Sequence, residues 1–217
     1  MRENPNPVEP LADCAQCIRL ADFRAANREA EPDWHNAPVA SFGIATAKLL
    51  VVGLAPGLKG ANRTGRPFTG DYAGDLLYAT LLKYKFARGT YGAHTADGLT
   101  LSDCRITNAV RCVPPQNKPL PAEIKACGGF LQATIADMSR LSAIVALGRI
   151  AHDAVLTSLA QRKSQFAFGH RAKHALTPNL TLFDSYHCSR YNTNTGVLTE
   201  AMFHQVFADV RAHLDNA

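Results

Sequence analysis

Four short apolar segments constrain what this chain can fold into more than any other feature of its sequence. They cover residues 48–53, 104–110, 143–148 and 180–183. A compact apolar run such as the first, which ends in Gly53, is typical of a strand buried inside a parallel sheet. Because helical patterns separate these segments, the sequence predicts an α/β/α sandwich on a mostly parallel sheet.

The expected helices are identified by the spacing of their apolar residues and by the residues at their starts. Helical patterns cover residues 11–28, 74–84, 121–138, 151–159 and 198–214. The third begins with Pro121, Ala122 and Glu123, which together favour a helical first turn. Thr199 is the expected cap of the last helix.

The order of strands and helices also predicts where a ligand binds. In open sheets of this kind, ligands bind in the crevice outside the carboxyl ends of the strands. Four groups of residues follow those ends, and we expect them to converge on one pocket. They are residues 53–57, 108–111, 148–149 and 185–187.

Length, composition and charge set outer limits on the function. The chain has 217 residues, 47% of them apolar, so we expect a single domain over residues 1–217. No apolar run reaches the roughly 18 residues needed to cross a bilayer, and residues 1–5 show no secretory signal. We therefore expect a cytoplasmic, nucleoid-associated protein. The net charge of +5 suits a polyanionic partner such as nucleic acid.

The loop after the first expected strand carries several chemically informative side chains. It lacks both the Lys-Ser/Thr ending of a nucleotide phosphate loop and the glycine spacing of a dinucleotide loop. Phe68 is either a stacking platform for a base or a core anchor for the loop. Asp71 is placed to stabilise a developing positive charge or to position a water molecule. The loop also contains three basic side chains, those of Lys59, Arg63 and Arg66.

Two other expected strand ends carry polar side chains suited to a nucleobase. Asn108 has an amide that can pair with the N3–H and O4 of uracil, although a turn-capping role is the alternative. His187 could donate a hydrogen bond to a base oxygen that gains charge, although a lone histidine is more often structural. Arg190 and Tyr191 then offer a phosphate contact and a wedge that could enter the base stack.

The cysteines give a separate signal, because disulfide bonds are a poor explanation for them without a secretion signal. Cys14 and Cys17 form a C-x2-C pair, and fourteen residues separate Cys112 from Cys127. Four thiolates suit an iron–sulfur cluster or zinc, so the sequence predicts a metal site. Cys104 lies inside an expected strand and should be buried and inert.

Together these segments resemble the iron–sulfur uracil-DNA glycosylases, and most closely the type b branch, also called family five. The resemblance rests on residues 53–57, 62–71, 107–121 and 187–196 and on the cysteine set. One departure is Cys188, because the family usually has proline after the motif histidine. Proline stiffens a loop, so cysteine leaves the geometry of this loop open.

The resemblance implies a fold, an activity and a cofactor. The fold is a three-layer α/β/α sandwich on a four-stranded, mostly parallel sheet. The activity is hydrolysis of the N-glycosidic bond of uracil in DNA, and of other deaminated bases such as hypoxanthine, after base flipping and without strand cleavage. The cofactor is a [4Fe-4S] cluster with a structural role, held by Cys14, Cys17, Cys112 and Cys127.

The same resemblance implies roles for the site residues. Phe68 would stack on the flipped base, Asn108 would read its edge and His187 would contact O2. Asp71 would be the catalytic carboxylate, with Asp75 as the alternative. The base-binding loop would include Gly53 and Leu54. The residues expected on DNA are Lys59, Arg63, Arg66, Arg190 and Tyr191.

Two other functions remain open from the residues alone. A DNA-binding or damage-sensing relative could keep the cluster and lack catalysis. A zinc-bound nucleotide hydrolase would need a carboxylate cluster for magnesium, and only Asp71 and Asp75 form a close pair near the expected pocket. We expect a monomer in each case.

Overall fold

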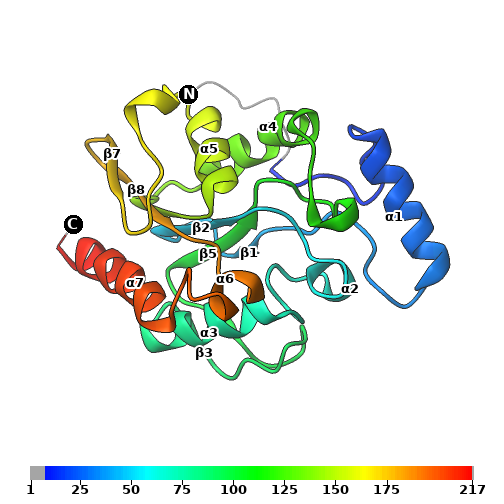
Figure 1. The fold of residues 1–217 in the computed structure, drawn as a ribbon, viewed down its shortest axis with the longest axis horizontal. Coiled ribbons are helices and arrows are strands. Elements are labelled where there is room, and N and C mark those ends of the chain that lie inside the picture. The colour runs from blue at the N-terminus through cyan, green and yellow to red at the C-terminus, as the bar shows by residue number, and fades with distance from the viewer. Residues whose placement is uncertain (1–7, 217) are drawn as a thin grey trace.

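The computed structural model describes residues 8–216, so residues 1–5, which show no secretory signal, lie outside it. Its centre is a six-stranded sheet with the order β1-β5-β2-β6-β8-β7 (Figure 1). The strands are β1 (Phe42–Gly43), β2 (Leu49–Gly53), β5 (Cys104–Asn108), β6 (Ala143–Leu147), β7 (Lys173–Thr177) and β8 (Leu180–Ser185). A separate two-stranded ribbon pairs β3 (Ala87–Arg88) with β4 (Thr100–Leu101).

The expected sheet of four strands is wrong in number, because two antiparallel edge strands extend it to six. The four strands predicted from apolar runs are β5, β2, β6 and β8, and all three pairings among them are parallel. The edge strands lack such runs: β1 has only two residues, and three of the five residues of β7 are exposed. An edge strand of this kind gives little hydrophobic signal in the sequence.

Seven α-helices surround the sheet within residues 8–216. They are α1 (Ile18–Ala30), α2 (Ala61–Thr64), α3 (Tyr72–Lys83), α4 (Pro121–Asp137), α5 (Arg149–Ser158), α6 (Arg190–Asn194) and α7 (Glu200–Asp215). The helix expected from residue 11 begins at Ile18, because the preceding chain turns at Cys14. The Thr199 cap is confirmed, since its side chain accepts a hydrogen bond from the Met202 amide. None of these helices has both the length and the apolar character to span a membrane.

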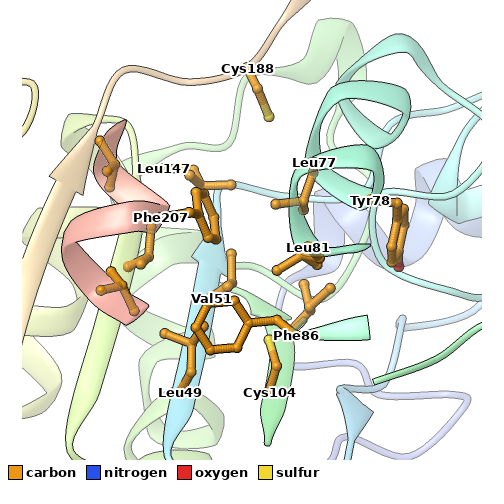
Figure 2. Packing of buried hydrophobic residues seen from close by; sticks show 14 of the residues in the cluster. Leu49, Val51, Leu77, Tyr78, Leu81, Phe86, Cys104, Leu147, Cys188 and Phe207 are labelled. Atoms are coloured by element: carbon orange, nitrogen blue, oxygen red, sulfur yellow. The ribbon is translucent and has the colours of Figure 1, made fainter. Parts of the chain in front are cut away.

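The predicted three layers are confirmed by two apolar clusters on opposite faces of the sheet. Helices α3 and α7 pack on one face, and α4 and α5 pack on the other (Figure 1). Figure 2 shows the first cluster, where Leu49 and Val51 of β2 lie among Leu77, Leu81 and Phe207. Because side chains alternate along β2, Leu50 and Val52 enter the second cluster.

A hydrogen-bonded asparagine pair joins α1 to the loop that follows β2. The side chain of Asn36 donates to the carbonyl oxygens of Asn27 (3.1 Å) and Glu31 (2.7 Å). Its Oδ1 accepts from the buried Asn62 side chain at 2.8 Å, and its amide donates to the Asn62 carbonyl at 3.1 Å. The N-terminal helix is therefore linked to α2 through Asn36.

A buried ion pair fixes the other side of the same loop and corrects one of our predictions. The Arg66 guanidinium donates to both carboxylate oxygens of Asp97, at 2.9 and 2.6 Å, and it also lies over the ring of Tyr78. Only 5% of the Arg66 side chain and 2% of that of Asp97 are exposed. The expected phosphate contact of Arg66 is therefore wrong, because a side chain so enclosed and paired is not available to DNA.

Replacing Asp97 with asparagine removes the charge that compensates Arg66. We expect the free energy of unfolding to fall by about 3 kcal/mol, because the mutation leaves a buried cation unpaired. Urea unfolding measures this change. The matched control is Asp209→Asn, which breaks a more exposed pair with Arg171 and should cost less than about 1 kcal/mol. Equal losses in the two variants would contradict the structural role of the Arg66–Asp97 pair.

Candidate active site

A cavity of about 720 Å³ opens at the carboxyl ends of β2, β5 and β8. Of the four groups of residues expected there, residues 54–57, Asn108 and His187 do line it. The group at residues 148–149 does not, because the Arg149 guanidinium lies over the Phe168 ring instead. Arg111 is also turned away, fully buried against Glu9. The prediction of a common pocket is thus confirmed for three of the four strand ends.

Asp71 supplies the carboxylate of this cavity. It caps the N-terminus of α3, where its Oδ1 accepts from the Gly74 amide at 3.2 Å. Burial raises the pKa of Asp71 above the ordinary aspartate value, while bonds from the Gly74 and Ala73 amides oppose that shift. The alternative, Asp75, is exposed and does not line the cavity. The geometry therefore favours Asp71 over Asp75 as the carboxylate that faces a ligand.

The absence of a side chain at two glycines makes room for the Asp71 carboxylate. A Cβ at Gly60 would overlap Asp71 Oδ2 and lie 2.9 Å from its Cγ, and a Cβ at Gly57 would lie 2.9 Å from Oδ2. The carboxylate cannot move away easily because backbone amides hold it. This close approach explains why glycine stands at both positions.

Phe68 forms one wall of the cavity from a constrained backbone position. Its φ of 53° lies in the left-handed region, which is uncommon for an aromatic residue. Tyr91 stabilises this conformation by donating its hydroxyl to the Phe68 carbonyl at 3.2 Å, and Tyr78 donates to the Pro67 carbonyl at 2.7 Å. The loop thus holds a flat ring against the cavity at a cost in local backbone energy.

Asn108 presents an unpaired amide oxygen to the same space. Only 3% of the residue is exposed, and its Oδ1 has no hydrogen-bond partner in the structure. Gly53 lies behind it rather than in the cavity lining, and a Cβ there would overlap Asn108 Oδ1 and approach Phe68 Cζ at 2.5 Å. A buried polar atom without a partner is costly, so Asn108 is poised to bind a ligand donor.

His187 lines the cavity next to Phe68, with ring centroids 6.1 Å apart and ring planes 28° apart. Although part of its surface remains open to the cavity, the surrounding protein desolvates the ring and lowers its pKa to about 4. The imidazole is therefore neutral near pH 7 and can donate one N–H. Asn192 fixes the backbone here by donating to the His187 carbonyl at 2.9 Å.

The rim of the cavity is basic and aromatic. Lys59 and Arg190 are exposed and line it, whereas Arg63 is exposed on α2 outside the lining. The Arg190 guanidinium lies 5.2 Å from the Tyr72 ring centroid, and 75% of Tyr191 is exposed beside it. The sequence alone gave no site role to three polar residues that line the cavity: Tyr72, Asn117 and Ser189.

The two unassigned cysteines are both buried. Cys104 lies in β5 with no exposed surface, which confirms the sequence prediction of burial. Cys188 points into the first apolar cluster (Figure 2). Its thiol donates to the Ala73 carbonyl at 3.5 Å. Burial raises the pKa of the Cys188 thiol far above its usual range, so it is no nucleophile.

The other four cysteines converge between α1 and α4. Cys14 and Cys17 pack against Cys112 and Cys127 around a small cavity. Burial raises the pKa of the free Cys112 thiol to about 11 and that of Cys127 to about 12, so these thiols have no reason to ionise on their own. Hydrogen bonds nevertheless reach both sulfurs, from Arg24 at 3.2 Å and from the Arg111 amide at 3.3 Å.

The spacing of these sulfurs bears on the metal centre that they could hold. Among residues 8–216, no three of these thiols have their sulfur atoms all within 4.8 Å of one another. Four sulfurs bound to one zinc at about 2.3 Å would lie less than about 4 Å apart. The donors aimed at the sulfurs of Cys112 and Cys127 suit thiolate ligands of a metal centre.

Comparison with known proteins agrees with this geometry. The family model for the uracil DNA glycosylase superfamily matches residues 40–211. The chain belongs to this superfamily. The match covers β2, β5, β6 and β8 and every residue of the cavity lining, so the superfamily fold and the candidate site coincide.

Individual members of the superfamily are similar over nearly the whole chain. A type-5 uracil-DNA glycosylase of Thermus thermophilus is 40% identical over 210 residues, covering 94% of this chain and 95% of its own. A type-5 uracil-DNA glycosylase of Mycobacterium leprae is 41% identical and covers 93% and 91%. A type-4 enzyme of Archaeoglobus fulgidus is 35% identical over 114 residues, about half of each chain.

The low pKa of His187 gives a test of the site in this superfamily member. A histidine in solution titrates near 6.5, whereas His187 should stay neutral down to about pH 4. We therefore expect its ring resonances in NMR spectra to remain constant between pH 5.5 and 8, with the His187→Gln spectrum providing the assignment.

The sign of the stability effect follows from the same difference. Below about pH 6.5 the unfolded chain takes up a proton at this position before the folded chain does, so His187 reduces stability progressively as the pH falls toward 4. A His187 resonance that titrates near its ordinary value would contradict a desolvated, neutral ring.

Proposed function

We propose that this protein is a uracil-DNA glycosylase, which removes uracil from DNA during base excision repair by hydrolysing the N-glycosidic bond. The observation that carries the proposal is the arrangement of Phe68, Asn108, His187 and Asp71 around one cavity. Recognition of a flipped pyrimidine requires a flat wall and a polar group that pairs with its edge, here an amide without a partner. Release of the base is served by a neutral imidazole and a carboxylate. The type-5 names of the similar proteins support the same assignment.

In this proposal the uracil ring stacks on Phe68. Asn108 reads its Watson–Crick edge, with the free Oδ1 accepting from uracil N3–H and the amide nitrogen donating to O4. Cytosine presents an acceptor at N3 and a donor at N4, so the same amide orientation meets two mismatched contacts. Discrimination against cytosine therefore comes from how Asn108 is oriented next to Gly53.

The bond to the sugar breaks toward a uracil anion and an oxocarbenium-like sugar. His187 donates an N–H to O2, where negative charge develops, and its neutrality means that it holds no charge that must be desolvated beforehand. Asp71 lines the same cavity, where a carboxylate stabilises the cationic sugar or directs the attacking water. Leu54, in the loop after β2, lines the same cavity and supplies no polar side-chain group.

The DNA backbone would bind along the basic rim. Lys59 and Arg190 are exposed in the cavity lining, and Arg63 is exposed on α2 outside it. Tyr191 is exposed enough to fill the gap left by the flipped base. Arg66 has no part in this contact, because Asp97 holds it inside the protein. The enzyme would act as a monomer on the nucleoid, and it would release other deaminated bases such as hypoxanthine.

We further propose that Cys14, Cys17, Cys112 and Cys127 hold a [4Fe-4S] cluster. The cluster would serve as a structural cross-link between the N-terminal segment and the start of the loop after β5, and it would take no part in bond cleavage. Support comes from the convergence of the four thiols and from Arg24, whose buried guanidinium faces Cys112 and has an unpartnered Nε. A buried cation of this kind complements the negative charge of a thiolate-bound cluster.

The excision assay uses a labelled duplex with one uracil opposite guanine, followed by alkali to reveal abasic sites. We expect the wild type to give strand breaks only after alkali, because we assign no Schiff-base lysine to the site. Asp71→Asn should lower the single-turnover rate by about 100-fold, since it removes the charge that faces the sugar. If wild-type protein loaded with its cofactor does not release uracil, the proposal is wrong, and the protein is a DNA-binding relative without catalysis.

Gly60→Ala tests the geometry of the carboxylate without removing it. The new Cβ would displace Asp71 Oδ2, so we expect the rate to fall by about tenfold or more. The control is Gly128→Ala, because a Cβ at Gly128 meets nothing within 4 Å. Far-ultraviolet circular dichroism checks that both variants fold. A Gly60→Ala rate equal to that of the wild type would mean that the position of Asp71 is not critical.

The cluster assignment has an independent readout in absorbance. Protein purified without oxygen should show a broad band near 400 nm and about four iron atoms per chain. Cys17→Ser should reduce both and lower the melting temperature, whereas Cys104→Ser should leave the iron content unchanged because Cys104 is distant in β5. Colourless protein that contains zinc in place of iron would overturn the assignment.

A further inference from the structure

A second group of metal-ligating side chains lies on the face of the sheet covered by α4 and α5. His152 of α5, His174 of β7 and Asp184 of β8 place three ligand atoms within 4.8 Å of one another. His152 Nδ1 lies 2.8 Å from Asp184 Oδ1, and His174 Nε2 lies 3.0 Å from Asp184 Oδ2. The mechanism proposed for base release uses none of these groups.

The group is almost completely enclosed. The exposed fractions of the side chains are 1% for His152, 0% for Asp184 and 13% for His174. The rings of Phe166 and Phe168 close the space, at 5.7 Å from His174 and 5.6 Å from His152 respectively. Three polar ligands inside an apolar wall, with one open side at His174, resemble the layout of a three-ligand transition-metal site.

The hydrogen-bond partners of His152 show why a cation is suited to this position. Its Nε2 lies 3.0 Å from the Phe166 carbonyl oxygen, so both ring nitrogens face oxygen acceptors. A neutral imidazole has only one N–H and cannot donate to both. If Nε2–H donates to the carbonyl, the lone pair of Nδ1 points at Asp184. Metal-bound histidines commonly hold their second nitrogen on a backbone carbonyl in this way.

We infer that His152, His174 and Asp184 form a binding site for a divalent transition-metal ion of the zinc class. His152 Nδ1, His174 Nε2 and one Asp184 oxygen are the ligands, and a water molecule enters on the open side at His174 to complete a tetrahedron. Ligand atoms around a zinc ion lie about 3.3 Å apart. The two nitrogen–oxygen separations in this group, 2.8 and 3.0 Å, are close to that value, and all three ligand atoms lie within 4.8 Å of one another. The site is separate from the four cysteines proposed to hold iron.

Its place in the fold indicates what a bound ion would stabilise. Asp184 lies three residues before His187, and the preceding part of β8 pairs with β7, where Phe183 lies opposite Lys173. The backbone amide of Asp184 donates to the carbonyl of Ala172, just before β7. An ion would join α5, β7 and β8 at the end of the sheet that carries the candidate active site. We therefore expect it to stabilise the fold there without contacting the base.

The test measures zinc uptake by protein that retains its iron. After equilibration with equimolar Zn²⁺ and removal of free metal, inductively coupled plasma mass spectrometry should find one zinc per wild-type chain, with absorbance near 400 nm unchanged. His174→Ala and Asp184→Asn should each lower zinc affinity by about tenfold or more. The control is His94→Ala, which removes an exposed histidine outside this group.

A second readout protects the test against misfolding of a variant. Zinc should raise the melting temperature of the wild type and of His94→Ala, and not that of His174→Ala. His174 is the ligand to rely on, because it lies on an edge strand and is partly exposed, so its replacement is the milder change. Wild type without retained zinc, equal uptake by His174→Ala, or uptake coupled to loss of the 400 nm band would each overturn the proposal.

Discussion

The parallel register between β2 and β5 is the constraint on which the candidate site depends. It pairs Gly53 with Asn108, the last residues of the two strands, and the matching ladder between β6 and β8 ends at Ser185, two residues before His187. Backbone hydrogen bonds therefore bring residues that are far apart in the sequence to one edge of the sheet. Shifting β5 by one residue would turn Asn108 to the opposite face.

The loop after β2 covers this edge of the sheet and encloses the cavity. Hydrogen bonds and an ion pair from several other segments hold the loop in place. The Tyr78 hydroxyl, from α3, donates to the Pro67 carbonyl, and the Tyr91 hydroxyl donates to the Phe68 carbonyl. The Arg66–Asp97 ion pair fixes the residue just before them. The uncommon backbone of Phe68 is thus maintained by several contacts outside the cavity. A residue such as Asp97 can therefore affect the site without touching a ligand.

The sequence was sufficient for the parallel core and for the residues at its strand ends, because a fully buried strand is apolar along its whole length. It was insufficient for β1 and β7, whose stability comes from pairing with a neighbour rather than from their own side chains. The wrong prediction that Arg66 contacts DNA has a related cause. A glycine-rich loop with basic residues suggests phosphate binding, but whether each cation points outward depends on Asp97, which lies 31 residues further along the chain.

The asparagine pair between Asn36 and Asn62 bears on how this enzyme can be handled as a reagent. Through it the N-terminal helix supports α2, which belongs to the loop that forms the cavity. A fusion partner or immobilisation tag attached before α1 would lie next to a helix whose contact through Asn36 supports the loop that forms the pocket. In Figure 1 the end of α7 lies on the side of the molecule away from α1 and α2. Attachment at the C-terminus is therefore the choice that leaves the pocket undisturbed.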